Sequence, residues 1–377
     1  MQMQTKSKSR LKVFLDNPSK ALWSLAIPIM FGMGIQTLYN LVDMLFIGRL
    51  GGNAITGIAF NMPLFFLVLG LTMGLGTGVT AAIARFIGED NKKQADNCAE
   101  HAVFIAFIIS ITLSSVGLLF GKDILSLFGA SGEILNLGWE YLHVMCVGMP
   151  FMIFSGFFRS ILAGEGDMKF PMMVAGLGTI LNIILDPIFI FELESYGNIG
   201  FGLGISGAAM ATVISQAIVF IVFIFMLFFK NHSYITFNLN DFSLSSDIIL
   251  NIIKIGLPAS LSMIVMAVGQ GVFNKILVHI SVETVAAYQV AGRLDMLVFL
   301  PIFSIAASLT TLIGMFYGAK EYEALRFTIR YGIFNPIIVH DIIFFITGYL
   351  ISYGIIFEKK KLVFVISIFF VSRFFTG

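Results

Sequence analysis

Apolar runs of about 20 residues or more recur along the chain, and short polar segments separate them. Each run is long enough for a helix to cross a hydrocarbon core of about 30 Å. A backbone in lipid must satisfy its own hydrogen bonds, so the pattern predicts an all-α polytopic membrane protein with about 9–10 spans. The expected spans are 21–47, 57–82, 101–120, 139–162, 170–191, 203–229, 252–280, 285–314, 331–356 and a partial run from 362.

Lysine and arginine concentrate in the N-terminal tail and in the loops that follow the even-numbered spans. The second span is followed by Lys92 and Lys93, whereas residues 192–202 contain neither lysine nor arginine. Positively charged loops stay in the cytoplasm, so the N-terminus is expected there. The first apolar run is too long for the core of a cleaved signal peptide. The expected location is therefore the cell (inner, cytoplasmic) membrane, which the chain crosses many times.

Composition narrows the function classes. Hydrophobic residues make up 58% of the 377 residues and charged residues 12%, against about 25% charged in soluble domains. The net charge of +1 provides no excess of positive charge for binding a nucleic acid. We therefore expect membrane lipid and small molecules as partners. Cys98 and Cys146 indicate neither a disulfide framework nor a metal cluster. The sequence shows no nucleophile–base pair, so an enzyme is not expected.

The chain contains an internal repeat. Pro28 in ALWSLAIPIMFGM matches Pro258 in NIIKIGLPASLSM, and the same offset in residue number pairs Gly88 with Gly318. Each unit would hold six spans, and an even number of spans keeps both units in the same orientation. The repeat therefore predicts two parallel six-helix lobes, a design that secondary transporters use.

The repeat also sets the expected domain boundaries. The segment SYITFNLNDFSLSSDI is rich in Ser, Asn and Asp and is typical of a linker. We expect an N-terminal lobe of six helices over 1–232, a cytoplasmic linker over 233–250 and a C-terminal lobe over 251–377. Two complete units at the repeat offset need about 460 residues. The second lobe is therefore expected to be incomplete, in a truncated or frame-disrupted product.

Asp43 and Asp186 lie inside predicted spans. A carboxylate at the bilayer centre costs at least about 2.5–3.5 kcal/mol, so both acids are functional candidates. Asn182 lies four residues before Asp186 and shares its helix face. Pro187 lacks an N–H and clashes with the carbonyl four residues earlier, so it should kink the helix and free that oxygen. A carboxylate, an amide and a free carbonyl at one depth predict an oxygen-rich site for a cation or a proton.

The first span carries a polar stripe. Gln36, Asn40 and Asp43 fall at helical spacing, and Tyr39 lies at the edge of the stripe. Hydrogen bonding between helices is the alternative role for these groups. That alternative is as good as a substrate-cavity role for the two amides, whereas the cost of burial favours a functional role for the acid.

Five segments of the chain form a recognisable set: NPSKALWSLAIP, TLYNLVDMLFIGRLG, LNIILDP, GISGAAMAT and GLPASLSM. With these segments the chain resembles, over about residues 16–356, the multidrug and toxic compound extrusion (MATE) family. The resemblance implies a twelve-helix antiporter with two six-helix lobes around a central cavity. Such proteins export cationic or amphipathic drugs and toxic compounds, driven by inward H⁺ or Na⁺. That coupling ion would be the sole cofactor and the sole metal expected, and the protein is expected to act as a monomer.

The resemblance also implies roles for individual residues. Asp43, Asn182 and Asp186 match the family's cation- or proton-coupling site in the N-terminal lobe. Tyr141 and Thr212 fall where the family places further polar groups of that site. Gln36 would line the same cavity.

Three alternatives stay open. A lipid-linked oligosaccharide flippase shares this general architecture, but its cavities are often cationic, whereas the first-half spans here carry two acids. An integral membrane enzyme would need a metal motif or a Ser/His pair at membrane depth. A non-functional fragment of a transporter is the third alternative.

Overall fold

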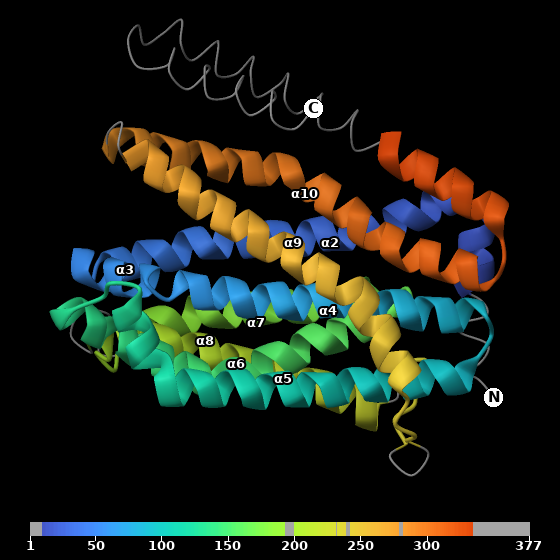
Figure 1. Ribbon diagram of the computed structural model, residues 1–377, viewed down its shortest axis with the longest axis horizontal. Helices are drawn as coiled ribbons and strands as arrows, with labels where there is room; N and C mark the ends of the chain where they lie inside the picture. The colour runs from blue at the N-terminus through green and yellow to red at the C-terminus, as the bar shows by residue number, and fades with distance from the viewer. Residues whose placement is uncertain (1–9, 193–199, 231, 239–241, 279–281, 335–377) are drawn as a thin grey trace, which may run out of the picture.

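The computed structural model describes residues 10–192, 200–230, 232–238, 242–278 and 282–334, and these ranges are almost entirely helical. Long helices run side by side along the longest axis of the molecule (Figure 1). The labelled helices are α2 (Pro18–Gly48), α3 (Gly52–Ala59), α4 (Met62–Gly88), α5 (Lys92–Leu127), α6 (Gly132–Gly164), α7 (Lys169–Ile190), α8 (Gly204–Ile224) with the π-helix η2 (Phe225–Phe229), α9 (Ser246–Val278) and α10 (Val282–Gly318). Residues 10–16 and 322–334 are helical as well.

Seven helical stretches among the described residues are long and apolar enough to cross a membrane. They confirm the prediction of an all-α polytopic membrane protein. The expected spans 331–356 and the run from 362 lie almost wholly outside the described residues. The boundaries at 232 and 250 stay a prediction, although residues 232–238 and 242–245 are outside helices as a linker would be.

Two details differ from the sequence-based expectation. The span expected at 57–82 is two helices, because Asn61 and Pro63 interrupt the chain between α3 and α4. Pro63 lacks an N–H and is best tolerated in the first turn of a helix, where it lies in α4. Residues 121–127, which lie beyond the expected span 101–120, belong to α5. Beyond the end of that helix lies Gly129, whose φ of +101° favours glycine and prevents the helix from continuing.

The internal repeat is visible in the backbone. Helix α4 ends at Gly88 and α10 ends at Gly318, the two glycines that the repeat offset pairs. Asp90 and Lys320, which the same offset pairs, have φ values of 56° and 60° and are the only described residues other than glycine with positive φ. In both units the helix ends at the matched glycine, and the matched residue two positions later has the rare left-handed conformation. These shared features confirm the two-unit architecture.

Helices α4 and α10 cross at matched positions of the two units. A Cβ on Gly88 would lie 2.1 Å from the carbonyl oxygen of Met315, and a Cβ on Gly318 would lie 2.1 Å from that of Arg85. Arg85 and Met315 are themselves a matched pair of the repeat. The two contacts are therefore the same contact made twice, as an approximate two-fold axis requires. Only glycine permits this approach of the two backbones.

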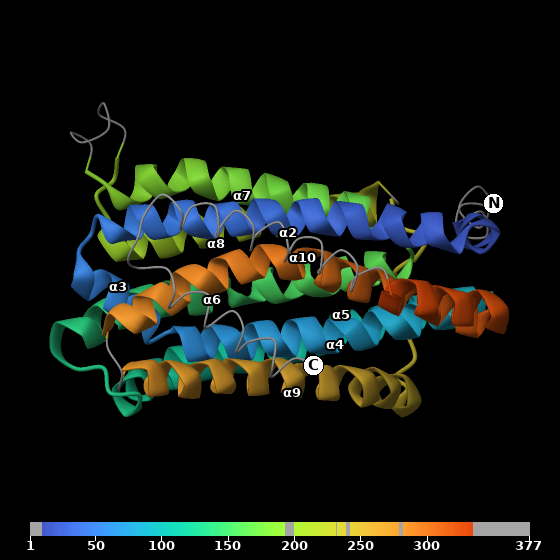
Figure 2. The same ribbon diagram turned by 90° about the horizontal axis from the view of Figure 1, so that it is seen from above.

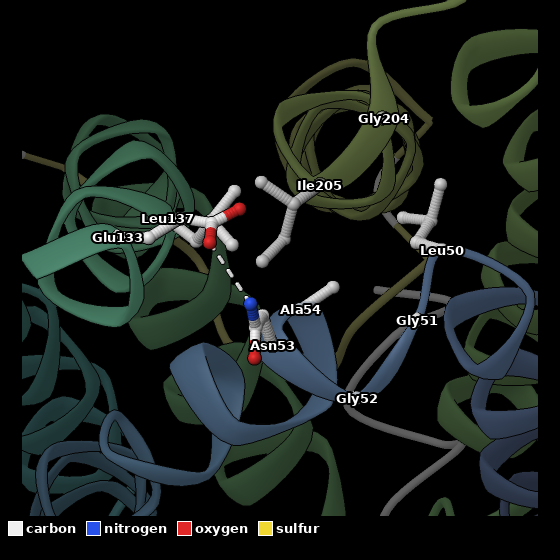
Figure 3. Close-up of a pocket in the computed structure, with 9 residues that line it drawn as sticks. All are labelled: Leu50, Gly51, Gly52, Asn53, Ala54, Glu133, Leu137, Gly204 and Ile205. Atoms are coloured by element: carbon white, nitrogen blue, oxygen red, sulfur yellow. Dashed lines mark hydrogen bonds between the residues drawn. The ribbon is translucent and has the colours of Figure 1, made fainter.

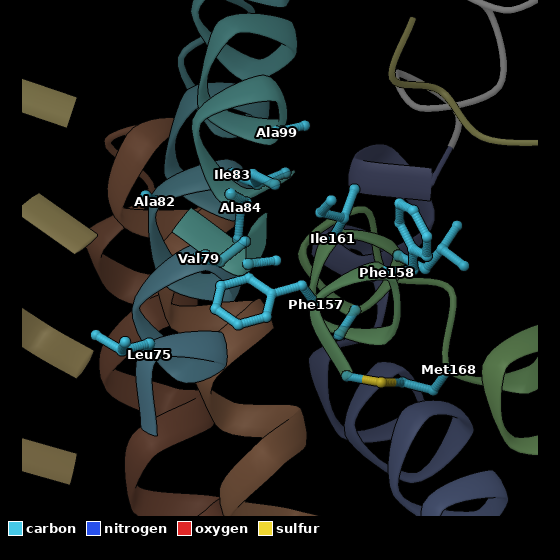
Figure 4. Packing of buried hydrophobic residues seen from close by; sticks show 14 of the residues in the cluster. Leu75, Val79, Ala82, Ile83, Ala84, Ala99, Phe157, Phe158, Ile161 and Met168 are labelled. Atoms are coloured by element: carbon cyan, nitrogen blue, oxygen red, sulfur yellow. The ribbon is translucent and has the colours of Figure 1, made fainter. Parts of the chain in front are cut away.

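The largest buried cluster joins α4, α5 and α6 to α10. Figure 4 shows Phe157 and Ile161 of α6 directed toward Val79 and Ile83 of α4. Figure 2 shows α7 and α9 on opposite sides of the bundle, with α4 beside α9. Small residues on α4 allow close packing where no hydrophobic effect draws helices together in lipid.

The segment between η2 and α9 is bound to the N-terminal half of the chain through hydrogen bonds to carboxylates of that half. Glu165, which follows α6 and is buried, accepts hydrogen bonds from the Ser233 hydroxyl, from Tyr234 N–H at 2.8 Å and from Ile235 N–H at 3.1 Å. Asp96 on α5 accepts from Thr236 N–H at 3.0 Å. These bonds satisfy backbone groups that no strand or helix pairs.

A second set of contacts holds the N-terminal segment to the same face. Arg10 pairs with Asp167 at 3.3 Å, and His232 Nε2 lies 3.1 Å from the same carboxylate. The short connection between α6 and α7 therefore contacts both the start of the chain and the segment that follows η2.

Candidate functional site

Asp186 lies near the end of α7 and is fully buried. Its Oδ1 accepts a hydrogen bond of 2.9 Å from Nδ2 of Asn182, one helical turn earlier and also buried. The spacing of four residues places both groups on one helix face. The predicted amide–carboxylate pair is therefore present in the structure.

The carboxyl group of Asp43, on α2, lies next to that of Asp186 within hydrogen-bond reach. Asp186 Oδ2 is buried, and no described N–H or hydroxyl donates to it. A hydrogen bond between two carboxyl groups requires a proton on one of them. The two acids that the sequence singled out thus form a pair whose carboxyl groups can share one proton.

Two tyrosines and a threonine surround this acid pair. Tyr39 is close to both acids and to Tyr141, and its hydroxyl faces the side chain of Thr212. Tyr141 of α6 is buried and also lies near both acids, with its ring 5.9 Å from that of Phe65. Four helices, α2, α6, α7 and α8, therefore supply polar groups to one place.

Tyr39 belongs to this constellation more directly than the sequence indicated, since the stripe placed it only at an edge. The available signal was its spacing, because Tyr39 and Asp43 are four residues apart and share a helix face. Gln36, on the same helix, is exposed, and the side chain of Asn40 lies outside the described part of the chain. Pro187 lies inside α7, which continues for three residues and ends at Ile190.

A separate cavity of about 400 Å³ lies at the end of the bundle where α3, α6 and α8 begin. Figure 3 shows Asn53 and Glu133 bridging it with a hydrogen bond of 2.9 Å. None of the predicted site residues lines this cavity. Asn53 and Glu133 are both exposed, so the cavity is part of the outer surface rather than of the acid pair.

The acid pair consists of hard oxygen donors, which suit H⁺ or Na⁺ rather than a transition metal. Among the described residues, no group of three or more His, Cys, Asp and Glu side chains is placed to hold a metal ion. A buried acid pair between membrane-spanning helices of a two-unit repeat defines a class of protein, the secondary transporter.

Comparison with known proteins identifies the family. The MatE family model matches residues 28–188 and 258–357. The chain therefore belongs to the MATE family of multidrug efflux transporters. Its relatives are transporters, so it is not an enzyme.

Individual relatives agree with this assignment. The chain is 27% identical over 321 residues to the probable multidrug resistance protein YoeA of Bacillus subtilis, a match over 84% of this chain and 68% of the relative. It is 30% identical over 316 residues to the probable multidrug resistance protein NorM of Thermotoga maritima, covering 83% and 66%. The chain thus spans about two thirds of the length of these relatives.

A solved structure shows the same fold. A crystal structure of a MATE protein in complex with MaL6 has a TM-score of 0.85 and 34% sequence identity, and the match covers 94% of this chain and 78% of that one. The all-helical, two-lobe expectation is confirmed.

Proposed function

We propose that the chain is a cation-coupled antiporter that exports cationic or amphipathic drugs and toxic compounds across the cell membrane. The coupling ion is H⁺ or Na⁺, and no other cofactor takes part. The observation that carries the proposal is the pair of Asp43 and Asp186, which come from helices far apart in the sequence and meet where Asp186 is fully buried. The protein acts as a monomer in the cytoplasmic membrane, with its N-terminus inside.

The acid pair would couple the two transport steps by competition for negative charge. An ionised pair attracts a cationic compound, and binding of H⁺ or Na⁺ between the carboxyl groups removes that attraction. The ion and the compound must favour different states of the transporter, because a ligand shifts an equilibrium only through its differential affinity. Asn182 holds Oδ1 of Asp186 in place during this exchange.

Helix α7 is suited to respond to the charge on Asp186. Pro187 directly follows the acid inside the helix and cannot donate a backbone hydrogen bond. The hydrogen-bond ladder is therefore weakest beside the titrating group. A change of charge at Asp186 would be relayed to α2 through Asp43 and to α6 through Tyr141.

Ethidium efflux from cells that express the chain tests the proposal. Asp43→Asn and Asp186→Asn each keep a similar shape but remove the charge, and we expect both to abolish efflux while the protein is still expressed. Asp123→Asn, at an exposed position of α5, is the matched control and should leave efflux unchanged. Unchanged efflux in both site variants would refute the proposal.

The coupling ion is identified with the purified chain in vesicles. An imposed pH gradient and an imposed Na⁺ gradient are applied separately, and uptake of ethidium is measured. The gradient that drives uptake in the unmodified chain, but not in Asp186→Asn, identifies the ion. Uptake that needs neither gradient would contradict antiport.

A further inference from the structure

Helix α7 has an interrupted hydrogen-bond ladder directly beside the acid pair. Pro187 has no N–H, so the carbonyl of Ile183 loses the partner that it would have four residues later. The helix continues for three residues after the proline and ends at Ile190. Asp186 therefore lies where its own helix holds it weakly, and contacts from outside α7 must fix its position.

Backbone hydrogen bonds bind this end of α7 to the segment that leads into α8. Ile188 O accepts from Phe201 N–H at 2.8 Å, and Phe189 O accepts from Leu203 N–H at 2.9 Å. These donors satisfy carbonyl groups that lack a partner at the end of a helix. The residues of α7 beyond the proline are thus joined to the start of α8.

Gly207 of α8 lies directly against the same part of the α7 backbone. A Cβ at residue 207 would lie 2.3 Å from the carbonyl oxygen of Phe189, 2.6 Å from its carbonyl carbon and 3.0 Å from the backbone nitrogen of Ile190. All three atoms belong to the backbone, so no rotation of a side chain makes room for a Cβ. Small residues allow membrane helices to approach this closely. The contact between Gly207 and Phe189 therefore sets the distance between the end of α7 and α8.

The same short stretch of α8 also carries a group of the acid site. Thr212, five residues after Gly207, donates its hydroxyl proton to Ala208 O at 3.1 Å. The oxygen of Thr212 is left to accept from Tyr39, whose hydroxyl it faces beside both acids. The contact that holds the end of α7 therefore also sets how Thr212 and Tyr39 lie relative to Asp186.

We propose that Gly207 is a positioning residue of the coupling site, which holds Asp186 within hydrogen-bond reach of Asp43 through its contact with Phe189. The inference rests on the proposed function, because it concerns how the acid pair binds its ion. Gly207 has no side chain and acts through the backbone of α7. The two carboxyl groups share an ion best at their present separation, since hydrogen bonds weaken steeply when their geometry is disturbed. A displacement of α7 against α8 therefore weakens ion binding.

Gly178 provides a matched control in the same pair of helices. It lies on α7, eight residues before Asp186, and a Cβ there would lie 2.5 Å from Cγ2 of Val219 on α8. Gly178→Ala therefore also crowds α7 against α8, but away from the acids. A loss of stability through overpacking is expected in both alanine variants. A change in ion binding is expected only in Gly207→Ala.

Labelling of the acids with dicyclohexylcarbodiimide tests the proposal on the purified chain in detergent. The reagent attaches to protonated carboxyl groups, so labelling falls as the pH rises. Mass spectrometry of the peptides that contain Asp43 and Asp186 gives the pH at which half of the labelling is lost. Gly207→Ala should lower this pH by about 0.5 or more, which corresponds to proton binding that is roughly threefold weaker. Gly178→Ala should change it by less than about 0.2.

The same labelling measures Na⁺ binding, because an ion held by the acids protects them from the reagent. If Na⁺ is the coupling ion, the NaCl concentration that halves the labelling at a fixed pH should rise about threefold or more in Gly207→Ala. A half-labelling pH and NaCl concentration that are both unchanged in Gly207→Ala, or that shift equally in Gly178→Ala, would overturn the proposal. The absence of any labelling of Asp43 and Asp186 in the unmodified chain would overturn it as well.

Leu203→Pro replaces Gly207→Ala if that variant does not fold. It removes the N–H that donates to Phe189 O without adding bulk between the helices, and the φ of −81° at residue 203 is close to that of proline. It should shift the labelling in the same direction, and an unchanged profile would then count against the proposal. Labelling does not depend on transport. Ethidium uptake that needs no ion gradient would therefore refute the proposed function while the positioning of Asp186 by Gly207 stands.

Discussion

Helix α2 of the first unit carries Asp43 at the position where α9 of the second unit carries Phe273, its partner under the repeat offset. The two units share their helix ends, their left-handed residue after the second span and their glycine contact. They differ at the position of Asp43, one of the two acids of the proposed coupling site. The shared features are those that set how helices pack, whereas the acid pair occurs in the first unit. A repeat thus preserves the packing frame and leaves the chemistry free to diverge.

The largest effect is expected from giving both matched positions the same residue. Asp43→Leu removes a charge from the acid pair, so we expect ethidium efflux to fall roughly tenfold or more, since hydrogen bonds to charged groups contribute about 1.5–3 kcal/mol. Phe273→Leu replaces one apolar side chain by another and should change efflux less than about twofold. Efflux rates at equal expression measure both. Similar losses in the two variants would mean that the units are functionally equivalent.

The glycine contact between α4 and α10 should be equally sensitive from both sides. Gly88→Ala and Gly318→Ala each place a Cβ 2.1 Å from a carbonyl oxygen, so the helices must separate. We expect each variant to lose on the order of 1–3 kcal/mol of stability, as overpacked cores do.

The Tm in detergent measures the effect of these glycine substitutions. Gly34→Ala on α2, where a Cβ would meet no atom within 4 Å, is the control and should keep or slightly raise the Tm. A large loss in one glycine variant and none in the other would break the two-fold relation between the units.

The break between α3 and α4 is a smaller difference between the units. Buried Asn61 donates from Nδ2 to Gly57 O at 3.0 Å and to Gly138 O at 3.1 Å, whereas the corresponding position in the continuous helix α10 is Ala291. Asn61→Ala should therefore lower the stability by about 1–2 kcal/mol, the contribution of two neutral hydrogen bonds.

Asn53→Ala is the matched control for that prediction. Asn53 bonds to Glu133 at an exposed position, so its loss should change the Tm little. If Asn61→Ala were as stable as this control, the two bonds would not be what maintains the break.

The sequence predicted the helices well because membrane spans have a strong signal in length and polarity. It placed span ends too far inward, as at 101–120 against Lys92–Leu127, since the ends of these helices are polar and leave the lipid. Within the site, the pairing of Asn182 and Asp186 followed from local helix geometry. The contact between Asp43 and Asp186 depends on how α2 packs against α7, and without the family resemblance no local pattern specifies it.

The segment between the two units is bound to the first unit through Glu165. The smallest expected effect concerns this attachment. Tyr234 and Ile235 donate their N–H groups to Glu165 of the first unit. Burial raises the pKa of Glu165 above its ordinary value of 4.5, although these donors oppose the shift. The folded protein therefore holds a proton on Glu165 at pH values where the unfolded chain has lost it.

This contribution of Glu165 to stability is fully present below pH 4.5 and is lost as the pH rises through the folded pKa. We expect the Tm of the unmodified chain to fall with rising pH more steeply than that of Glu165→Gln, which cannot ionise. Glu323→Gln, at an exposed position, should keep the slope of the unmodified chain. Parallel curves for all three proteins would show that Glu165 does not couple the attachment of the second unit to pH.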